Sequence, residues 1–305
     1  MGFKNRDVIS IHEFSKDEIL HILKVAEQLE KNPKPDLLKG KVMAVVFYEP
    51  STRTRLSFTT AMEQLGGEIL DFGTTDRTSV KKGETLWDTM KMLDAYSDII
   101  VIRHPLEGSA RLAAEASDNP VLNGGDGANQ HPTQTLLDLY TIKKLKGKLT
   151  GLKIGMLGDL KYGRTVHSLA TAMVHFNPEF KFIAPQALQM PKEYLDMLDK
   201  HRIPYTLEAD MTDSINDLDI LYVTRIQQER FPDPIEYEKF KGVYKLDKNA
   251  LKNVKKDLKI MHPLPRVDEI SPEVDSTAHA AYFEQAANGV YTRQALLALL
   301  LGEIK

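Results

Sequence analysis

The first half of the chain alternates short apolar runs with segments of helical periodicity. Strand-like runs occupy residues 42–48, 68–72, 98–102 and 121–122, and amphipathic segments predict helices over 15–30, 84–96, 107–117 and 132–144. A further helix is predicted after residue 51, because apolar side chains recur at helical spacing up to a Gly-Gly pair. Strands that alternate with helices in this way are typical of an α/β fold with a parallel sheet.

The alternation breaks at a glycine-containing segment, residues 147–151, and then restarts. Strands are expected near 153–157, 180–184, 203–207 and 219–223, with a helix near 164–176. Because 305 residues exceed the usual size of a single core, two lobes are expected, with a cleft between them that holds the active site. We predict a first domain over 1–146, a second over 147–286, and a C-terminal helix of about 287–305 that packs back on the first. Each lobe would be a parallel sheet flanked by helices.

Ser51-Thr52-Arg53-Thr54-Arg55 is the most informative segment, because it lies where an apolar strand leads into a helix. The unpaired N–H groups and the dipole at a helix start favour an anion, and hydroxyl and guanidinium groups add charge-assisted hydrogen bonds. The segment therefore predicts a phosphate or oxyanion site. The alternative is an ordinary serine N-cap followed by solvated arginines.

Other polar side chains also follow predicted strands. Arg103 comes directly after an apolar run, and a glycine-rich loop beginning at Gly124 leads to His131 and to Pro132, which suits the first turn of a helix. In open α/β sheets ligands bind at the carboxyl ends of strands, so Arg103 and His131 are candidate ligand-binding residues. The alternatives are an arginine that caps neighbouring carbonyl groups and a histidine with a structural role.

A second glycine-bounded segment, Gly158–Thr165, fits the P-loop pattern except that Arg164 stands where a P-loop has lysine. An arginine at a helix start equally suits a carboxylate. Two more polar segments, 224–230 and 262–266, follow apolar runs. The prolines of the latter segment stiffen the backbone and can hold carbonyl groups outward as hydrogen-bond acceptors.

Composition narrows the functional classes. With 40 basic and 43 acidic residues the chain has no overall field that favours nucleic acid. The absence of cysteine excludes disulfides, thiolate metal sites and a cysteine nucleophile. The first residues lack the apolar core of a signal peptide, and the longest apolar run, 295–301, is too short to span a bilayer. These features predict a soluble, cytoplasmic protein.

Together these motifs resemble the aspartate/ornithine carbamoyltransferase family. The family's carbamoyl-phosphate motif matches residues 47–55, and its second shared motif matches 131–134. The aspartate branch of the family is indicated by residues 158–168, 225–227 and 262–265. The ornithine branch is expected to carry a cysteine in the last of these segments, and this chain has none. The resemblance covers nearly the whole chain.

The resemblance implies a role for each matching residue. Carbamoyl-phosphate binding would involve Ser51, Thr52, Arg53, Thr54, Arg103, His131, Gln134 and the backbone carbonyl groups of Pro263 and Leu264. Within that set the catalytic residues, which would polarise the carbamoyl carbonyl group, are Thr54, Arg103 and His131. The carboxylates of L-aspartate would be bound by Arg164 and Arg225, assisted by Gln227.

The implied reaction transfers the carbamoyl group to the α-amine of L-aspartate and yields N-carbamoyl-L-aspartate and phosphate. It is an early step of de novo pyrimidine biosynthesis. Since the substrate amine attacks directly, no protein nucleophile, cofactor or metal is expected.

The resemblance also implies partner chains. Ser79 and Lys82 match a family loop that reaches the active site of a neighbouring subunit, where Lys82 would also bind aspartate, so a homotrimer is expected. The loop is one residue shorter than the expected pattern, and Lys81 is therefore an alternative to Lys82. Some family members join zinc-binding regulatory chains into an allosteric complex, partly through the segment that matches 228–245, and the resemblance allows such a partner here.

Two other functional classes stay open at this point. One is an ornithine-type or other carbamoyltransferase with the same first lobe. The other is a non-enzymatic two-lobe protein that binds an anion or a nucleotide through Gly158–Thr165, although Arg164 in place of lysine argues against it.

Overall fold

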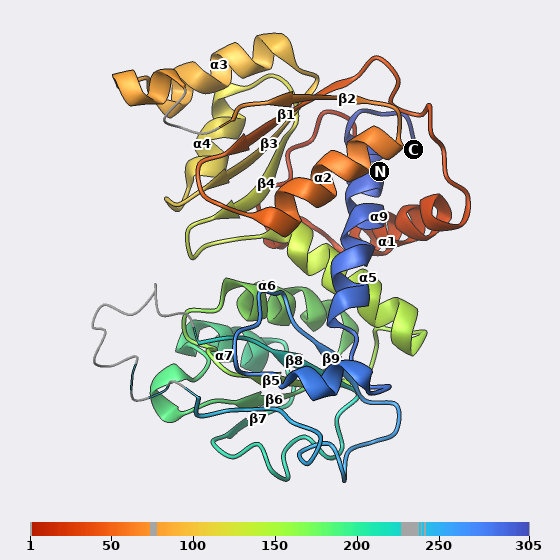
Figure 1. Cartoon of the computed structure of the whole chain (residues 1–305), viewed down its shortest axis with the longest axis vertical. Coiled ribbons are helices and arrows are strands. Elements are labelled where there is room, and N and C mark those ends of the chain that lie inside the picture. The colour runs from red at the N-terminus through yellow and green to blue at the C-terminus, as the bar shows by residue number, and fades with distance from the viewer. Residues whose placement is uncertain (1, 74–77, 227–237, 239, 241, 305) are drawn as a thin grey trace. The chain divides into compact units, whose positions relative to one another are not determined.

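The chain forms two compact units in a computed structural model that describes residues 2–73, 78–226, 238, 240 and 242–304. The first unit comprises Met1–Tyr140 and Ala287–Lys305, and the second comprises Thr141–Ala286. Each unit is built on a parallel sheet flanked by helices, so the predicted α/β class is confirmed (Figure 1). Among the described residues no helix is both long and apolar enough to cross a membrane.

The sheet of the first unit has the strand order β2-β1-β3-β4, and every neighbouring pair is parallel. Its strands are β1 (Val42–Phe47), β2 (Glu68–Asp71), β3 (Ile99–His104) and β4 (Val121–Asp126). The central strands are apolar along most of their length because both faces of the sheet are covered, as is usual in parallel sheets.

Helices cover both faces of this sheet. They are α1 (Lys16–Lys31), α2 (Thr52–Gln64), α3 (Leu86–Tyr96), α4 (Ser109–Ala116), α5 (Pro132–Lys146) and α9 (Tyr282–Leu300), with short 3₁₀ turns η1 (Ile11–Glu13) and η3 (Ser79–Lys82). On one face a buried cluster joins the sheet to α3 and α4 and includes Ala44, Val46, Met90, Leu93, Ala110 and Ala113. Within this unit, α2 and α9 lie on the other side of the sheet (Figure 1), and the chain leaves and re-enters the unit within α5 and α9.

The strand β4 differs from its prediction. A strand was expected only at 121–122, with a glycine-rich loop from Gly124, yet β4 continues to Asp126 and all six of its residues are buried. The polar side chains of Asn123 and Asp126 are satisfied inside the protein by backbone groups, which periodicity alone does not reveal. The loop expectation was wrong for 124–126, and the true loop starts after Asp126.

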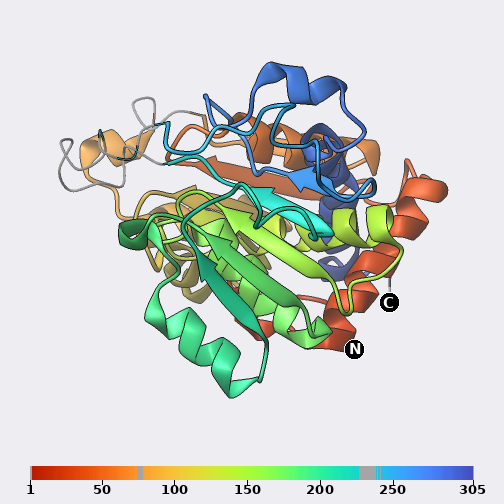
Figure 2. The ribbon, with the colours of Figure 1, turned by 90° about the horizontal axis from the view of Figure 1, so that it is seen from below.

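The sheet of the second unit has the strand order β7-β6-β5-β8-β9 and is also parallel. Its strands are β5 (Lys153–Leu157), β6 (Glu179–Ile183), β7 (Tyr205–Glu208), β8 (Ile220–Val223) and β9 (Lys259–Met261), and they fan with the usual twist of such sheets (Figure 2). Its helical segments are α6 (Arg164–Met173), η4 (Val174–Phe176), η5 (Gln186–Leu188), α7 (Lys192–Lys200) and η7 (Pro272–Ser276). A largely irregular stretch covers one face through buried side chains that include Leu246, Leu251, Ile270 and Val274.

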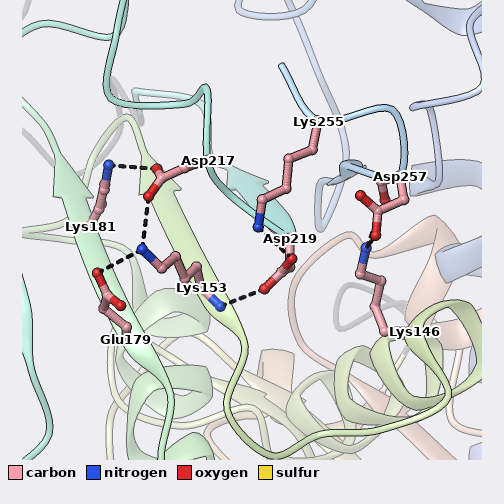
Figure 3. Close-up of polar contacts among 8 residues, drawn as sticks. All are labelled: Lys146, Lys153, Glu179, Lys181, Asp217, Asp219, Lys255 and Asp257. Atoms are coloured by element: carbon pink, nitrogen blue, oxygen red, sulfur yellow. Dashed lines mark hydrogen bonds and ion pairs between the residues drawn. The ribbon is translucent and has the colours of Figure 1, made fainter.

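Alternating charges join the amino ends of the strands in the second unit (Figure 3). Asp217 accepts hydrogen bonds from Lys181 at 2.7 Å and from Lys153 at 2.9 Å. Asp219 accepts the backbone N–H of Lys153 at 2.9 Å and the ammonium of Lys255 at 2.9 Å. Because the strands are parallel, these charges lie at the end of the sheet opposite to the carboxyl ends of the strands. The candidate site residues of this unit follow the carboxyl ends instead.

Candidate active site

The anion-binding segment predicted from sequence lies between β1 and α2. Ser51 is the N-cap residue of α2, but its side chain makes no capping hydrogen bond within the described part of the chain. Thr54 is buried, whereas Arg55 is exposed and pairs with Asp71. Arg53 is exposed like Arg55, as the alternative of solvated arginines expects, whereas the buried side chain of Thr54 is not explained by that alternative.

Register across the sheet brings Arg103 to this segment. Phe47 on β1 and Arg103 on β3 are register partners, and the N–H of Tyr48 donates to the Arg103 carbonyl at 2.9 Å. Burial, and next the positive charge of Arg103, lower the pKa of the Arg53 guanidinium. The two guanidinium groups repel each other, and an anion bound between them would offset this repulsion.

The Arg103 side chain is held in place by two acceptors. Its Nη1 donates to the carbonyl of Gly124 at 3.1 Å, and its Nη2 lies 2.7 Å from Glu49 Oε1. A Cβ added to Gly124 would lie 3.2 Å from the Ile102 carbonyl oxygen and 3.5 Å from Thr54 Cγ2. The glycine thus allows β4 to approach the two segments that carry the cationic and hydroxyl groups.

His131 lies next to Thr54. The Nε2 atom of His131 is 3.4 Å from Thr54 Oγ1, its Nδ1 atom is 3.4 Å from Thr133 Oγ1, and the residue is 4% exposed. The loop before it is held by Asp126, which accepts the backbone N–H groups of Gln130 and Gly108 at 3.0 Å. Sequence reasoning did not identify Asp126 as a positioning residue, although an acidic residue beside glycines at a strand end was a signal.

Gln134 is oriented by a buried carboxylate. Its Nε2 donates to Asp138 Oδ1 at 2.9 Å, and Asp138 is fully buried on α5. The guanidinium of Arg293 on α9 compensates this charge. Asp138 raises the pKa of Arg293, but burial has the larger effect and lowers that pKa to about 9. The guanidinium also lies 4.8 Å from the Phe58 ring centroid. Because the Gln134 amide donates to Asp138 through its nitrogen, its oxygen points away from that carboxylate and can accept a hydrogen bond.

In the second unit, Arg164 and Arg225 follow neighbouring strands at their carboxyl ends. Leu157 and Val223 are register partners on β5 and β8, so the chains after both strands leave the sheet together. A Cβ on Gly158 would lie 2.2 Å from the carbonyl oxygen of Thr224, so this close approach requires glycine. Arg164 begins α6, and both arginines are half-buried.

His167, on the same helix as Arg164, has a structural environment. It stacks on Tyr194 with ring centroids 4.2 Å apart, and its Nε2 lies 2.7 Å from the Leu160 carbonyl oxygen. Burial lowers its pKa to about 4, so the imidazole is neutral at physiological pH. It serves packing rather than charge recognition.

The remaining predicted residues are distributed as follows. Pro263 and Leu264 follow β9 at its carboxyl end, beside β8. Ser79, Lys81 and Lys82 are exposed on η3 of the first unit. Gln227 and most of the segment 228–245 lie outside the described residues.

The fold and these side chains define an α/β protein in which cationic, hydroxyl and imidazole groups gather at the carboxyl ends of parallel strands. Two models of the aspartate/ornithine carbamoyltransferase family match this chain. The model of the family's carbamoyl-phosphate-binding domain matches residues 6–144, and the model of its aspartate/ornithine-binding domain matches residues 150–300. The chain belongs to this family, and the resemblance read from the motifs is confirmed.

Relatives and solved structures agree with this membership. The chain is 58% identical to the aspartate carbamoyltransferase catalytic subunit of Thermococcus kodakarensis, over 99% of both chains. It is similar to the catalytic subunit of M. jannaschii aspartate transcarbamoylase, with 51% identity, a TM-score of 0.90, and 97% and 98% of the two chains covered. It is also similar to aspartate transcarbamoylase from Trypanosoma cruzi in complex with carbamoyl aspartate and phosphate, with 37% identity, a TM-score of 0.93, and 98% and 97% covered.

Proposed function

We propose that the protein transfers the carbamoyl group of carbamoyl phosphate to the α-amine of L-aspartate. The products are N-carbamoyl-L-aspartate and phosphate, in an early step of de novo pyrimidine biosynthesis. The observation that carries the proposal is the cationic site formed by Arg53 on α2 and Arg103 on β3, next to the contact between Thr54 and His131. The relatives named as aspartate carbamoyltransferase catalytic subunits support the choice of acceptor.

In this proposal the first domain, over 1–146 with the C-terminal helix, binds carbamoyl phosphate. Its phosphate is held by Ser51, Thr52, Arg53, Thr54 and Arg103. The lowered pKa of Arg53 supports this role, since a dianionic phosphate would offset the repulsion between the two guanidinium groups. Glu49 pairs with Arg103 and offsets part of the positive charge at this site.

Thr54, Arg103 and His131 act on the carbamoyl carbonyl oxygen. Donors aimed at that oxygen stabilise the negative charge that develops when the amine attacks, and one such donor contributes about 3 kcal/mol. The burial of Thr54 and His131 supports this role, because hydrogen bonds to a developing charge are stronger away from water. Gln134 accepts from the carbamoyl –NH2 group, together with the carbonyl groups of Pro263 and Leu264.

The second domain, over 147–286, binds L-aspartate. Arg164 and Arg225 bind its two carboxylates, and the register of β5 with β8 supports their acting together. Gln227 assists them, and no protein nucleophile takes part. Holding two substrates in attack geometry contributes about 7–11 kcal/mol, so positioning and charge stabilisation account for the chemistry.

We further propose that the active protein is a cytoplasmic homotrimer. Ser79 and Lys82 of one subunit would reach the site of its neighbour, and the exposure of η3 in the first unit supports their availability. Lys81 is the alternative to Lys82. A zinc-binding regulatory chain is a further candidate partner, through the segment 228–245, which would make the assembly allosteric.

The test is carbamoyl transfer by the purified chain from carbamoyl phosphate to L-aspartate, with L-ornithine as a parallel acceptor. Carbamoyl-aspartate alone is the expected product, whereas citrulline would retain the first domain's assignment and overturn the second's. Arg53→Ala should abolish turnover. Arg55→Ala, two residues further along the same helix, should retain it, since the charge of Arg55 is paired with Asp71. Equal losses in both variants would contradict the assigned phosphate site.

A further inference from the structure

His262 directly follows the strand β9 and lies directly before the two residues assigned to the carbamoyl –NH2 group. Its side chain is 1% exposed. The imidazole Nδ1 accepts the backbone N–H of Leu264 at 2.8 Å, and its Nε2 is 2.6 Å from Glu269 Oε1. Since Nδ1 accepts, the ring proton is on Nε2 and is donated to Glu269.

Glu269 holds both ends of the same loop. Its Oε1 accepts from His262, and its Oε2 accepts the backbone N–H groups of Val267 at 3.0 Å and Asp268 at 3.1 Å. Burial raises the pKa of this carboxyl, but the hydrogen bonds that it accepts from His262 and from backbone N–H groups outweigh burial and leave the pKa below its usual range. Gln285, which is buried, accepts the backbone N–H of His262 at 2.8 Å. The ring of His262 is therefore fixed from its backbone and from its far nitrogen.

The hydrogen bond to Leu264 N–H orients a whole peptide group. The N–H of Leu264 and the carbonyl of Pro263 belong to one planar unit, and in a trans peptide these two groups point in opposite directions. An N–H directed at buried His262 thus directs the Pro263 carbonyl away from the buried ring. Leu264 itself has φ +57°, a left-handed conformation that a leucine adopts only when surrounding contacts hold it.

We infer that His262, oriented by Glu269, is a positioning residue that fixes the Pro263–Leu264 peptide as an acceptor for the carbamoyl –NH2 group. The inference rests on the proposed function, in which these carbonyl groups bind that –NH2. The imidazole does not touch the substrate. It acts by holding an acceptor in place before the substrate arrives, which lowers the cost of ordering the loop on binding.

Two substitutions separate the contacts of the imidazole. In His262→Asn the amide oxygen lies near the position of Nδ1 and can still accept the Leu264 N–H, while the contact with Glu269 is lost. In His262→Gln the longer amide reaches the position of Nε2 and can still donate to Glu269, while the acceptor for Leu264 is lost. We expect His262→Gln to raise the KM for carbamoyl phosphate roughly tenfold, the equivalent of one lost hydrogen bond, and His262→Asn to raise it less than about threefold.

Inorganic phosphate distinguishes positioning from general damage. It occupies the phosphate site but has no –NH2 group, so its inhibition constant should not change in either variant. A rise in that constant parallel to the KM would overturn the inference, as would equal effects of His262→Asn and His262→Gln. His201→Gln, an exposed histidine in the same unit, is the control for substitution itself.

Glu269→Gln keeps the inference testable if a His262 variant does not fold. It preserves the size of the side chain and removes its charge, so the KM for carbamoyl phosphate should rise about three- to tenfold while phosphate inhibition is unchanged. An unchanged KM would overturn the role of Glu269 in orienting His262. Failure of the proposed function would appear separately, because wild-type protein would then form no carbamoyl-aspartate.

Discussion

Removing the charge of Asp217 should weaken the second unit without affecting the candidate site. Asp217 lies before β8, at the amino edge of the sheet, and binds Lys181 and Lys153 from β6 and β5 (Figure 3). Burial raises the pKa of its carboxyl, but the two lysine hydrogen bonds outweigh burial and bring the pKa to about 2, against an ordinary value of 3.8. Asp217→Asn keeps the shape of the side chain and removes the charge, so it isolates this ionic contribution.

The magnitude follows from the pKa difference. A lowering from 3.8 to about 2 corresponds to ~2.4 kcal/mol of stability at neutral pH for a fully protected group. The Asp217 side chain is 44% exposed, so solvent screening reduces this value to ~1 kcal/mol. For a unit of this size such a loss corresponds to roughly 2–4 °C in Tm, or to ~0.5 M in the urea midpoint.

The pH dependence has a definite sign. A carboxyl with a folded-state pKa below its unfolded value stabilises fully above pH 3.8, and this stability is lost as the pH falls towards 2. Urea unfolding of wild type and Asp217→Asn should therefore show a gap that is constant at neutral pH and about half as large at pH 3. Asp196→Asn, in an exposed i,i+4 pair with Lys192, is the control and should cost less than about 0.5 kcal/mol.

Two results would refute this reasoning. An equal gap at pH 7 and pH 3 would mean that shape rather than charge causes the loss. A loss no larger than that of Asp196→Asn would mean that the contacts of Asp217 contribute no more than a surface pair. Carbamoyl transfer at neutral pH should be the same in Asp217→Asn as in wild type, because the substitution lies at the opposite edge of the sheet from the assigned residues.

Further predictions concern the assigned site. His131→Ala should lower kcat far more than it weakens carbamoyl-phosphate binding, since its donor matters most as the oxyanion develops; equal losses would make it a binding residue. Arg225→Ala should mainly reduce kcat/KM for aspartate, by 100-fold or more at roughly 3 kcal/mol for a lost charge-assisted contact, and unchanged aspartate kinetics would contradict the assignment. Asp138→Asn should raise the KM for carbamoyl phosphate roughly tenfold by freeing the Gln134 amide to turn over, and an unaltered KM would exclude this orienting role.

Local sequence determined more of the candidate site than of its support. Ser51–Arg55 carries its chemistry within five adjacent residues, and its place at the start of a helix follows from the apolar run before it and the helical spacing after it. Arg103 and His131 could be selected because polar groups at the ends of parallel strands collect at one edge. The strand–helix alternation likewise predicted two parallel sheets, since that pattern is a property of neighbouring residues.

Tertiary structure alone decided which groups hold these side chains. Asp138 orients Gln134 one helical turn away, and the buried Arg293, more than 150 residues further along, contributes a compensating positive charge in the core. Glu269 contacts His262 across an irregular loop whose sequence shows no helix or strand pattern. The register of β1 with β3 brings Arg103 close to Glu49. β4 continues through two glycines because backbone groups in the interior form hydrogen bonds with its polar side chains, such as that of Asn123. The pattern of apolar residues does not reveal these bonds.

One physical cause separates the features that the local sequence determined from those that the tertiary structure decided. Helix and strand periods and helix starts are set by interactions among residues close in sequence, so the chain alone determined the α/β class and the candidate phosphate-binding segment. Burial and strand register are set by contacts between residues far apart in sequence. These contacts bury the carboxylates of Asp138 and Glu269 and make them groups that orient a neighbouring side chain. The sequence by itself therefore determined what chemistry is present, and only the folded structure decided which atoms are held ready to perform it.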